Sequence, residues 1–73
     1  MHLRVDCQPQ RGSAEAEPSV IWFGSRRVPV LCVVDRWWGP TRRWWKVQTG
    51  EGAYVLRLEQ DTGEWTLAAV VRT

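Results

Sequence analysis

Residues 36–46 combine the two side-chain types that are best suited to binding chemistry in this chain. Their sequence, Arg-Trp-Trp-Gly-Pro-Thr-Arg-Arg-Trp-Trp-Lys, holds four of the six tryptophans. The guanidinium of arginine forms bidentate hydrogen bonds with phosphate and stacks on planar rings. Tryptophan offers a ring face on which a base can stack. The stretch therefore predicts a surface that contacts single-stranded DNA or DNA-bound partners. Its candidate binding residues are Arg36, Trp37, Trp38, Arg42, Arg43, Trp44 and Lys46.

The same residue types also dominate the energetics of protein interfaces. A protein-interaction or homo-oligomerisation domain without nucleic-acid contact is therefore the alternative function, with a DNA repair protein or a second copy of this chain as partner. Successive side chains of a strand point to opposite faces, so we expect one of Trp37 and Trp38, and one of Trp44 and Trp45, to lie in the core.

The basic charge is confined to the middle of the chain. Residues 20–46 contain six basic residues and one acidic residue, a net charge of +5. Residues 1–19 carry −1 and residues 47–73 carry −2, which leaves the whole chain at +2. A nearly neutral protein thus contains a basic segment, and this segment coincides with the tryptophan-rich stretch.

Residue combinations typical of a catalytic or metal site are lacking. His2 is the only histidine, and Cys7 and Cys32 do not form a C-x-x-C motif. The glycines of residues 50–52 lie between two predicted strands, whereas a phosphate-binding loop opens a helix. We therefore expect a protein that is not an enzyme and that uses no metal or cofactor.

Cysteine usage and hydropathy indicate a compartment. Two cysteines allow at most one disulfide, and the sequence does not begin with a charged leader, an apolar run and a cleavage site. The longest apolar stretch, residues 28–34, is far shorter than the roughly 18 residues of a membrane span. We predict a cytoplasmic protein with reduced cysteines and no membrane insertion, in which Cys32 is a small core residue.

Alternating apolar residues and glycine-containing turns predict five or six antiparallel strands in meander order. Strands are expected near residues 2–6, 20–23, 26–35, 42–49, 53–59 and from residue 65 onward, and turns at residues 24–25, 39–41, 50–52 and 60–63. Residues 8–18 lack apolar periodicity and contain two prolines and a glycine, which favours a polar loop. No window of the sequence favours an amphipathic helix.

These elements predict a single all-β domain, folded as a strongly bent sheet or a small open barrel, because a flat sheet would leave its edges and a tryptophan-rich face wet. Residues 1–18 would be an N-terminal strand and polar loop, and residues 19–73 the antiparallel β domain. The register of residues 28–34 stays open, since both faces are apolar. The core candidates are Trp22, Val30, Cys32, Trp45, Val47, Tyr54, Leu56, Leu58, Trp65, Leu67 and Ala69.

A set of short motifs on these β-rich segments resembles the small C-terminal domain of the ImuB proteins. The motifs are Val-Ile-Trp at 20–22, Asp-Arg-Trp-Trp at 35–38, Arg-Arg at 42–43, Val47, Gly-Ala-Tyr-Val-Leu at 52–56 and Gly-Glu-Trp at 63–65. ImuB proteins are inactive relatives of Y-family DNA polymerases in the bacterial mutasome, and the domain also occurs alone in small proteins. The resemblance spans about residues 20–71. It implies an interaction or DNA-contacting module in DNA repair or translesion synthesis, without catalytic residues.

Overall fold

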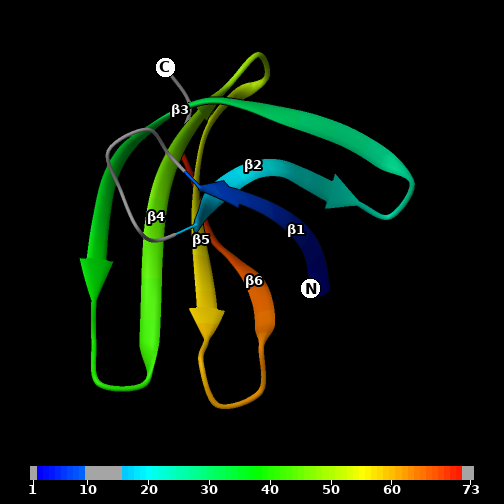
Figure 1. Ribbon diagram of the computed structural model, residues 1–73. Coiled ribbons are helices and arrows are strands. Elements are labelled where there is room, and N and C mark those ends of the chain that lie inside the picture. Colours follow the sequence, from blue (N-terminus) through cyan, green and yellow to red (C-terminus); the bar gives the residue numbers. More distant parts are fainter. Residues whose placement is uncertain (1, 10–15, 72–73) are drawn as a thin grey trace.

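The computed structural model describes residues 2–9 and 16–71, which form six antiparallel strands and no helix. Each strand pairs with the next one along the chain, and β1 also pairs with β6, so the sheet closes into a small barrel (Figure 1). The predicted all-β meander is confirmed. The strands are β1 (His2–Pro9), β2 (Ala16–Phe23), β3 (Arg26–Trp38), β4 (Arg42–Thr49), β5 (Gly52–Glu59) and β6 (Glu64–Val71).

The predicted turns connect these strands as short hairpins. Gly24 and Gly63 have positive φ angles of 64° and 75°, a conformation that glycine adopts without the steric cost paid by other residues. The turn after β3 closes with a 2.7 Å hydrogen bond, which the Gly39 amide donates to the Arg42 carbonyl. Glycine placement therefore identified the hairpin positions correctly.

Strand β3 turns the corner between two layers of sheet. Residues 26–29 pair with β2, whereas residues from Val30 to Trp38 pair with β4. The β3–β4 ladder slips by one residue at Leu31 and again at Val34, so neither residue has a partner on β4. Such bulges bend a strand and increase its twist. They allow one 13-residue strand to serve both layers.

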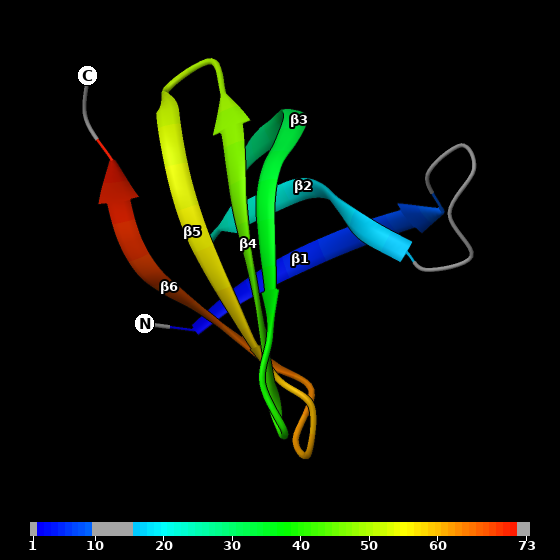
Figure 2. The same cartoon turned by 90° about the vertical axis from the view of Figure 1, so that its left-hand side faces the viewer.

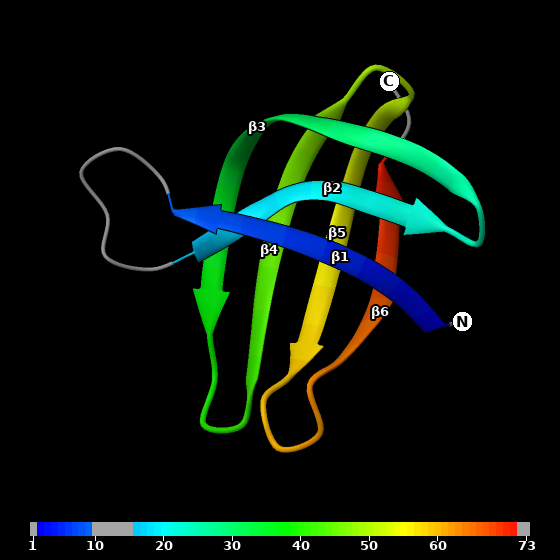
Figure 3. The same ribbon diagram turned by 45° about the vertical axis from the view of Figure 1, so that its right-hand side comes forward.

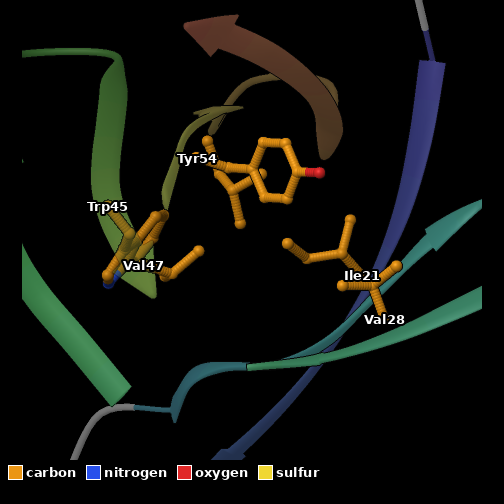
Figure 4. Packing of buried hydrophobic residues seen from close by; sticks show 6 residues of the cluster. Ile21, Val28, Trp45, Val47 and Tyr54 are labelled. Carbon is orange, nitrogen blue, oxygen red and sulfur yellow. The ribbon is translucent and has the colours of Figure 1, made fainter. Parts of the chain in front are cut away.

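The core lies between these two layers. In Figure 3, β1 and β2 cross over β4 and β5. Figure 4 shows Ile21 and Val28, from β2 and the first part of β3, facing Val47 and Tyr54 from β4 and β5. The buried cluster consists of Ile21, Val28, Trp45, Val47, Tyr54 and Leu56. Leu3, Val5, Phe23, Val30, Val33, Leu58, Trp65 and Leu67 are partly buried against it.

Most of the predicted core residues occupy or contact this cluster, but Trp22, Cys32 and Ala69 do not. Ile21, not Trp22, faces inward, and the Trp22 indole donates a 2.9 Å hydrogen bond to Asp6. Cys32 is exposed because the bulge at Leu31 places it opposite Gln48, away from the core. A slip at Ala68 has the same effect on β6, where Ala69 lies opposite the outward-facing Val55 and is exposed.

The strand limits also differ from the sequence prediction. The proposed polar loop of residues 8–18 is wrong at both ends, because β1 continues to Pro9 and β2 begins at Ala16. Its central part, residues 10–15, lies outside the described residues. Pro18 and Glu17 are buried in the barrel wall. Strand β3 continues to Trp38 and does not end near Asp35, because its pairing with β4 extends to the turn.

The bulge at Val34 predicts opposite responses of two valines to the same substitution. Val34 is 53% exposed, whereas Val47 is 0% exposed. Val34→Thr should leave the free energy of unfolding within about 0.5 kcal/mol of the wild-type value. Val47→Thr buries a hydroxyl among apolar side chains and should cost about 1 to 3 kcal/mol. Urea denaturation measures both, and equal losses would contradict the bulged register.

Candidate functional site

The candidate binding residues lie at the end of the β3–β4 hairpin. In Figures 1 and 3, this hairpin and the β5–β6 hairpin extend past the region where β1 and β2 cover the sheet. Trp37 and Trp38 are therefore both exposed, at 45% and 51%. The expectation that one of them would be a core residue is wrong, because here the sheet has no covering layer among the described residues. For Trp44 and Trp45 it is confirmed, since Trp45 is buried.

The strand register divides the candidate residues between the two faces of the hairpin. Residues that lie directly opposite each other on antiparallel strands share a face. Arg36 lies opposite Trp45, and Trp38 lies opposite Arg43, on the side that continues into the core. We call Arg36, Trp38 and Arg43 the inner hairpin face. Trp37 lies opposite Trp44, and these two residues with Arg42 and Lys46 form the outer hairpin face.

On the inner hairpin face, a guanidinium accompanies the exposed indole. The Arg43 guanidinium carbon lies 5.9 Å from the centre of the Trp38 ring, within cation–π range. Arg43 also lies opposite Leu58, which packs against the core. Across the sheet, Arg43 therefore lies between Leu58 and the exposed Trp38.

Arg36 forms a forked ion pair with Glu17 of β2. The Arg36 Nε and Nη2 groups donate hydrogen bonds of 2.6 Å and 3.1 Å to the two carboxylate oxygens of Glu17. The Glu17 side chain is 11% exposed and that of Arg36 is 40% exposed. The pair joins the two layers where β2 and β3 no longer share backbone hydrogen bonds. Its geometry uses the strongest form of arginine–carboxylate pairing, so Arg36 has a structural role.

Glu17 was not among the residues that the sequence identified. It stands in the stretch assigned to a polar loop, 19 positions before Arg36. Residue type and local spacing carry no signal for a contact between strands so far apart in the sequence.

On the outer hairpin face, Trp44 folds over the turn. A Cβ atom added to Gly39 would come within 3.2 Å of the Trp44 ring, which shows how closely the ring covers this glycine. Trp44 is consequently only partly exposed. Trp37, opposite Trp44, is the more accessible of the two rings.

The cations of the outer hairpin face differ in their pairing. Arg42 Nε lies 2.8 Å from Glu59, and Arg57 of the neighbouring strand approaches the same carboxylate at 3.3 Å. Lys46 forms no ion pair with any residue of the described part of the chain. Two of the four basic candidates, Arg36 and Arg42, are thus neutralised within the domain. The positive field of the hairpin is weaker than the sequence indicates.

The two cysteines lie on different strands, Cys7 on β1 and Cys32 on β3. Cys7 and Cys32 are free thiols, and partial burial, together with the charge of Asp6, raises the pKa of the Cys7 thiol above its ordinary value. A raised pKa keeps this thiol protonated and weakly nucleophilic near neutral pH. Across residues 2–9 and 16–71, no group of three or more His, Cys, Asp or Glu side chains could hold a metal ion.

The chain was compared with protein families, with curated proteins and with solved structures. No protein-family model, curated protein or solved structure matches the chain. Within the described segments, no helix is long and apolar enough to cross a membrane.

The Arg36–Glu17 ion pair makes a double-mutant prediction. Arg36→Met leaves the nearly buried Glu17 carboxylate without its partner and should lower the free energy of unfolding by about 1 to 3 kcal/mol. Adding Glu17→Gln removes the stranded charge, so the double variant should lose less than Arg36→Met alone. Arg27→Met is the matched control, because Arg27 is exposed and forms no ion pair with a described residue. The four variants Arg36→Met, Glu17→Gln, their double variant and Arg27→Met are compared by urea denaturation, and additive effects of the two changes would contradict the coupling.

Proposed function

We propose that the domain is a non-catalytic binding module whose β3–β4 hairpin contacts single-stranded DNA. The observation that carries this proposal is the exposure of two adjacent indole rings, Trp37 at 45% and Trp38 at 51%, at the end of the hairpin. Exposed aromatic rings beside cations are the common feature of single-strand binding surfaces, because each base has a face that can stack. Duplex bases are already stacked on one another and do not offer these faces.

The division into two faces supports a specific mode of contact. Trp37 and Trp38 point to opposite sides of β3, so each ring would receive a base from its own side of the hairpin. On the inner side, Arg43 lies close enough to Trp38 to contact a neighbouring phosphate. On the outer side, Lys46 is the cation that forms no ion pair with a described residue. The strand would therefore run across the end of the hairpin.

We further propose that this binding serves DNA repair or translesion synthesis. The support for this setting is the resemblance of residues 20–71 to the ImuB C-terminal domain. A small accessory domain that holds single-stranded DNA beside a polymerase would need stacking surfaces and moderate positive charge, and no catalytic group.

The binding mode is tested with fluorescently labelled single strands of about 12 nucleotides, followed by anisotropy. Trp37→Ala and Trp38→Ala should each weaken binding by about 1 to 3 kcal/mol, roughly 5- to 150-fold in Kd. Trp22→Ala, which removes a partly exposed indole of β2, is the matched control and should leave the affinity unchanged. With two or three phosphates contacted, the slope of log affinity against log salt should be about −1.4 to −2.

Two results would contradict the proposal. One is the absence of binding at low salt. The other is equal affinity for a single strand and for a duplex of the same length, because stacking on Trp37 and Trp38 requires unpaired bases. Circular dichroism of each variant establishes that the barrel is intact before the affinities are compared.

A further inference from the structure

The β2-side edge of β3 is unpaired beyond the corner. Backbone pairing between β2 and β3 ends at Pro29, and beyond it β3 pairs only with β4 among the described strands, with Leu31 and Val34 left unpaired by the bulges. A hollow of about 430 Å³ separates the two strands here, lined by Glu17, Pro18, Val30 and Arg36 among others. An unpaired strand edge presents a row of backbone N–H and C=O groups that can pair with another strand.

Apolar side chains are concentrated on the same segment. The described part of the chain has five exposed large hydrophobic residues, and four of them, Leu31, Val34, Trp37 and Trp38, lie within residues 31–38. Leu31 is 68% exposed and Val34 is 53% exposed, since the two bulges turn them away from the core. Lysine and proline, which protect many natural sheet edges, do not occur within residues 31–38.

We propose that residues 31–38 of β3 pair antiparallel with the same segment of a second copy of this chain, about a two-fold axis near Val34. The segment is complementary to itself. It contains one acidic and one basic residue, Asp35 and Arg36, so two copies do not repel each other through net charge. Antiparallel pairing about this axis brings Leu31 of one copy beside the tryptophans of the other, a favourable aliphatic–aromatic combination. A two-fold axis also makes the contact isologous and closed, so it stops at a dimer.

The geometry of the barrel leaves this edge accessible. Figure 2 is viewed from the side on which β3 lies in Figure 1, so the second half of β3 is the part of the sheet nearest to the viewer. Pairing along this edge would join the two four-stranded layers into one continuous sheet. It uses backbone groups, the bulge residues and the contact between Leu31 and Trp37, and it leaves the ring of Trp38, which points to the other face of β3, available. The dimer and the proposed DNA contact therefore share Trp37, whereas Leu31 and Val34 belong to the dimer alone.

Analytical ultracentrifugation over about 5 to 500 µM protein tests the pairing. The wild-type chain should pass from monomer to a species of twice its mass as concentration rises. Val34→Lys places two ammonium groups beside each other at the axis and should weaken the dimer by at least about tenfold. Val70→Lys is the matched control, because Val70 is 50% exposed but lies on β6, and it should dimerise as the wild type does. Leu31→Lys is a second variant at the same edge and should also weaken the dimer.

Two outcomes would overturn the proposal. A wild-type chain that stays monomeric throughout the concentration range excludes self-pairing of β3. A dimer that is lost in Val70→Lys and retained in Val34→Lys places the contact on β6. Circular dichroism and thermal unfolding show that each lysine variant keeps its fold. Because DNA affinity is measured separately, failure of the dimer and failure of DNA binding are distinguishable.

Discussion

Residues of β3 pair with only one neighbouring strand at a time, and the rest of the molecule depends on this constraint. The first four residues complete the layer formed with β1 and β2, and the remaining segment begins the layer formed with β4, β5 and β6. The bulges at Leu31 and Val34 supply the bend between the layers. They close a small core around Ile21 and Val47, and they leave the far end of β3 without a covering layer among the described residues. Exposure of Trp37 and Trp38 is a consequence of this geometry.

Charge pairing modifies what the hairpin can bind. Glu17 and Glu59 each form an ion pair with an arginine of the candidate set. Part of the positive charge of the hairpin is therefore neutralised within the domain. The remaining surface is rich in ring faces and moderate in charge. This balance favours a partner that can stack on indole rings over one held by many phosphate contacts. The same balance permits two copies to approach along β3 without strong repulsion.

The sequence predicted the parts of the fold in which alternation is strict and turns carry glycine. Strands β4 and β5 alternate without a bulge in their shared ladder, so Trp45, Val47, Tyr54 and Leu56 were placed correctly. Cys32 and Ala69 were assigned to the wrong face of their strands, because each follows a bulge, at Leu31 and at Ala68. Apolar residues stand on both sides of these slips, so no local pattern marks them. Ile21 and Trp22 were interchanged for a related reason, since both are large and apolar.

The candidate site shows the same limit. Residue types located the hairpin, and the alternation within residues 42–49 placed Trp44 and Trp45 on opposite faces. Local alternation could not show that the sheet extends past β1 and β2, and so it assigned one of Trp37 and Trp38 to the core. It also could not find Glu17, whose contact with Arg36 depends on how the two layers cross. Long-range packing, not residue type, decides which of the basic residues are available.

Interstrand nuclear Overhauser effects between β3 and β4 test the central constraint most directly, because they report which backbone protons lie opposite each other. The bulged register predicts contacts between Val33 and Val47 and between Trp37 and Trp44, with no partner on β4 for Val34. A ladder without a bulge at Val34 would instead place Val34 opposite Val47. Backbone proton contacts of Val47 with Val34 in place of Val33 would contradict the account of β3 given above.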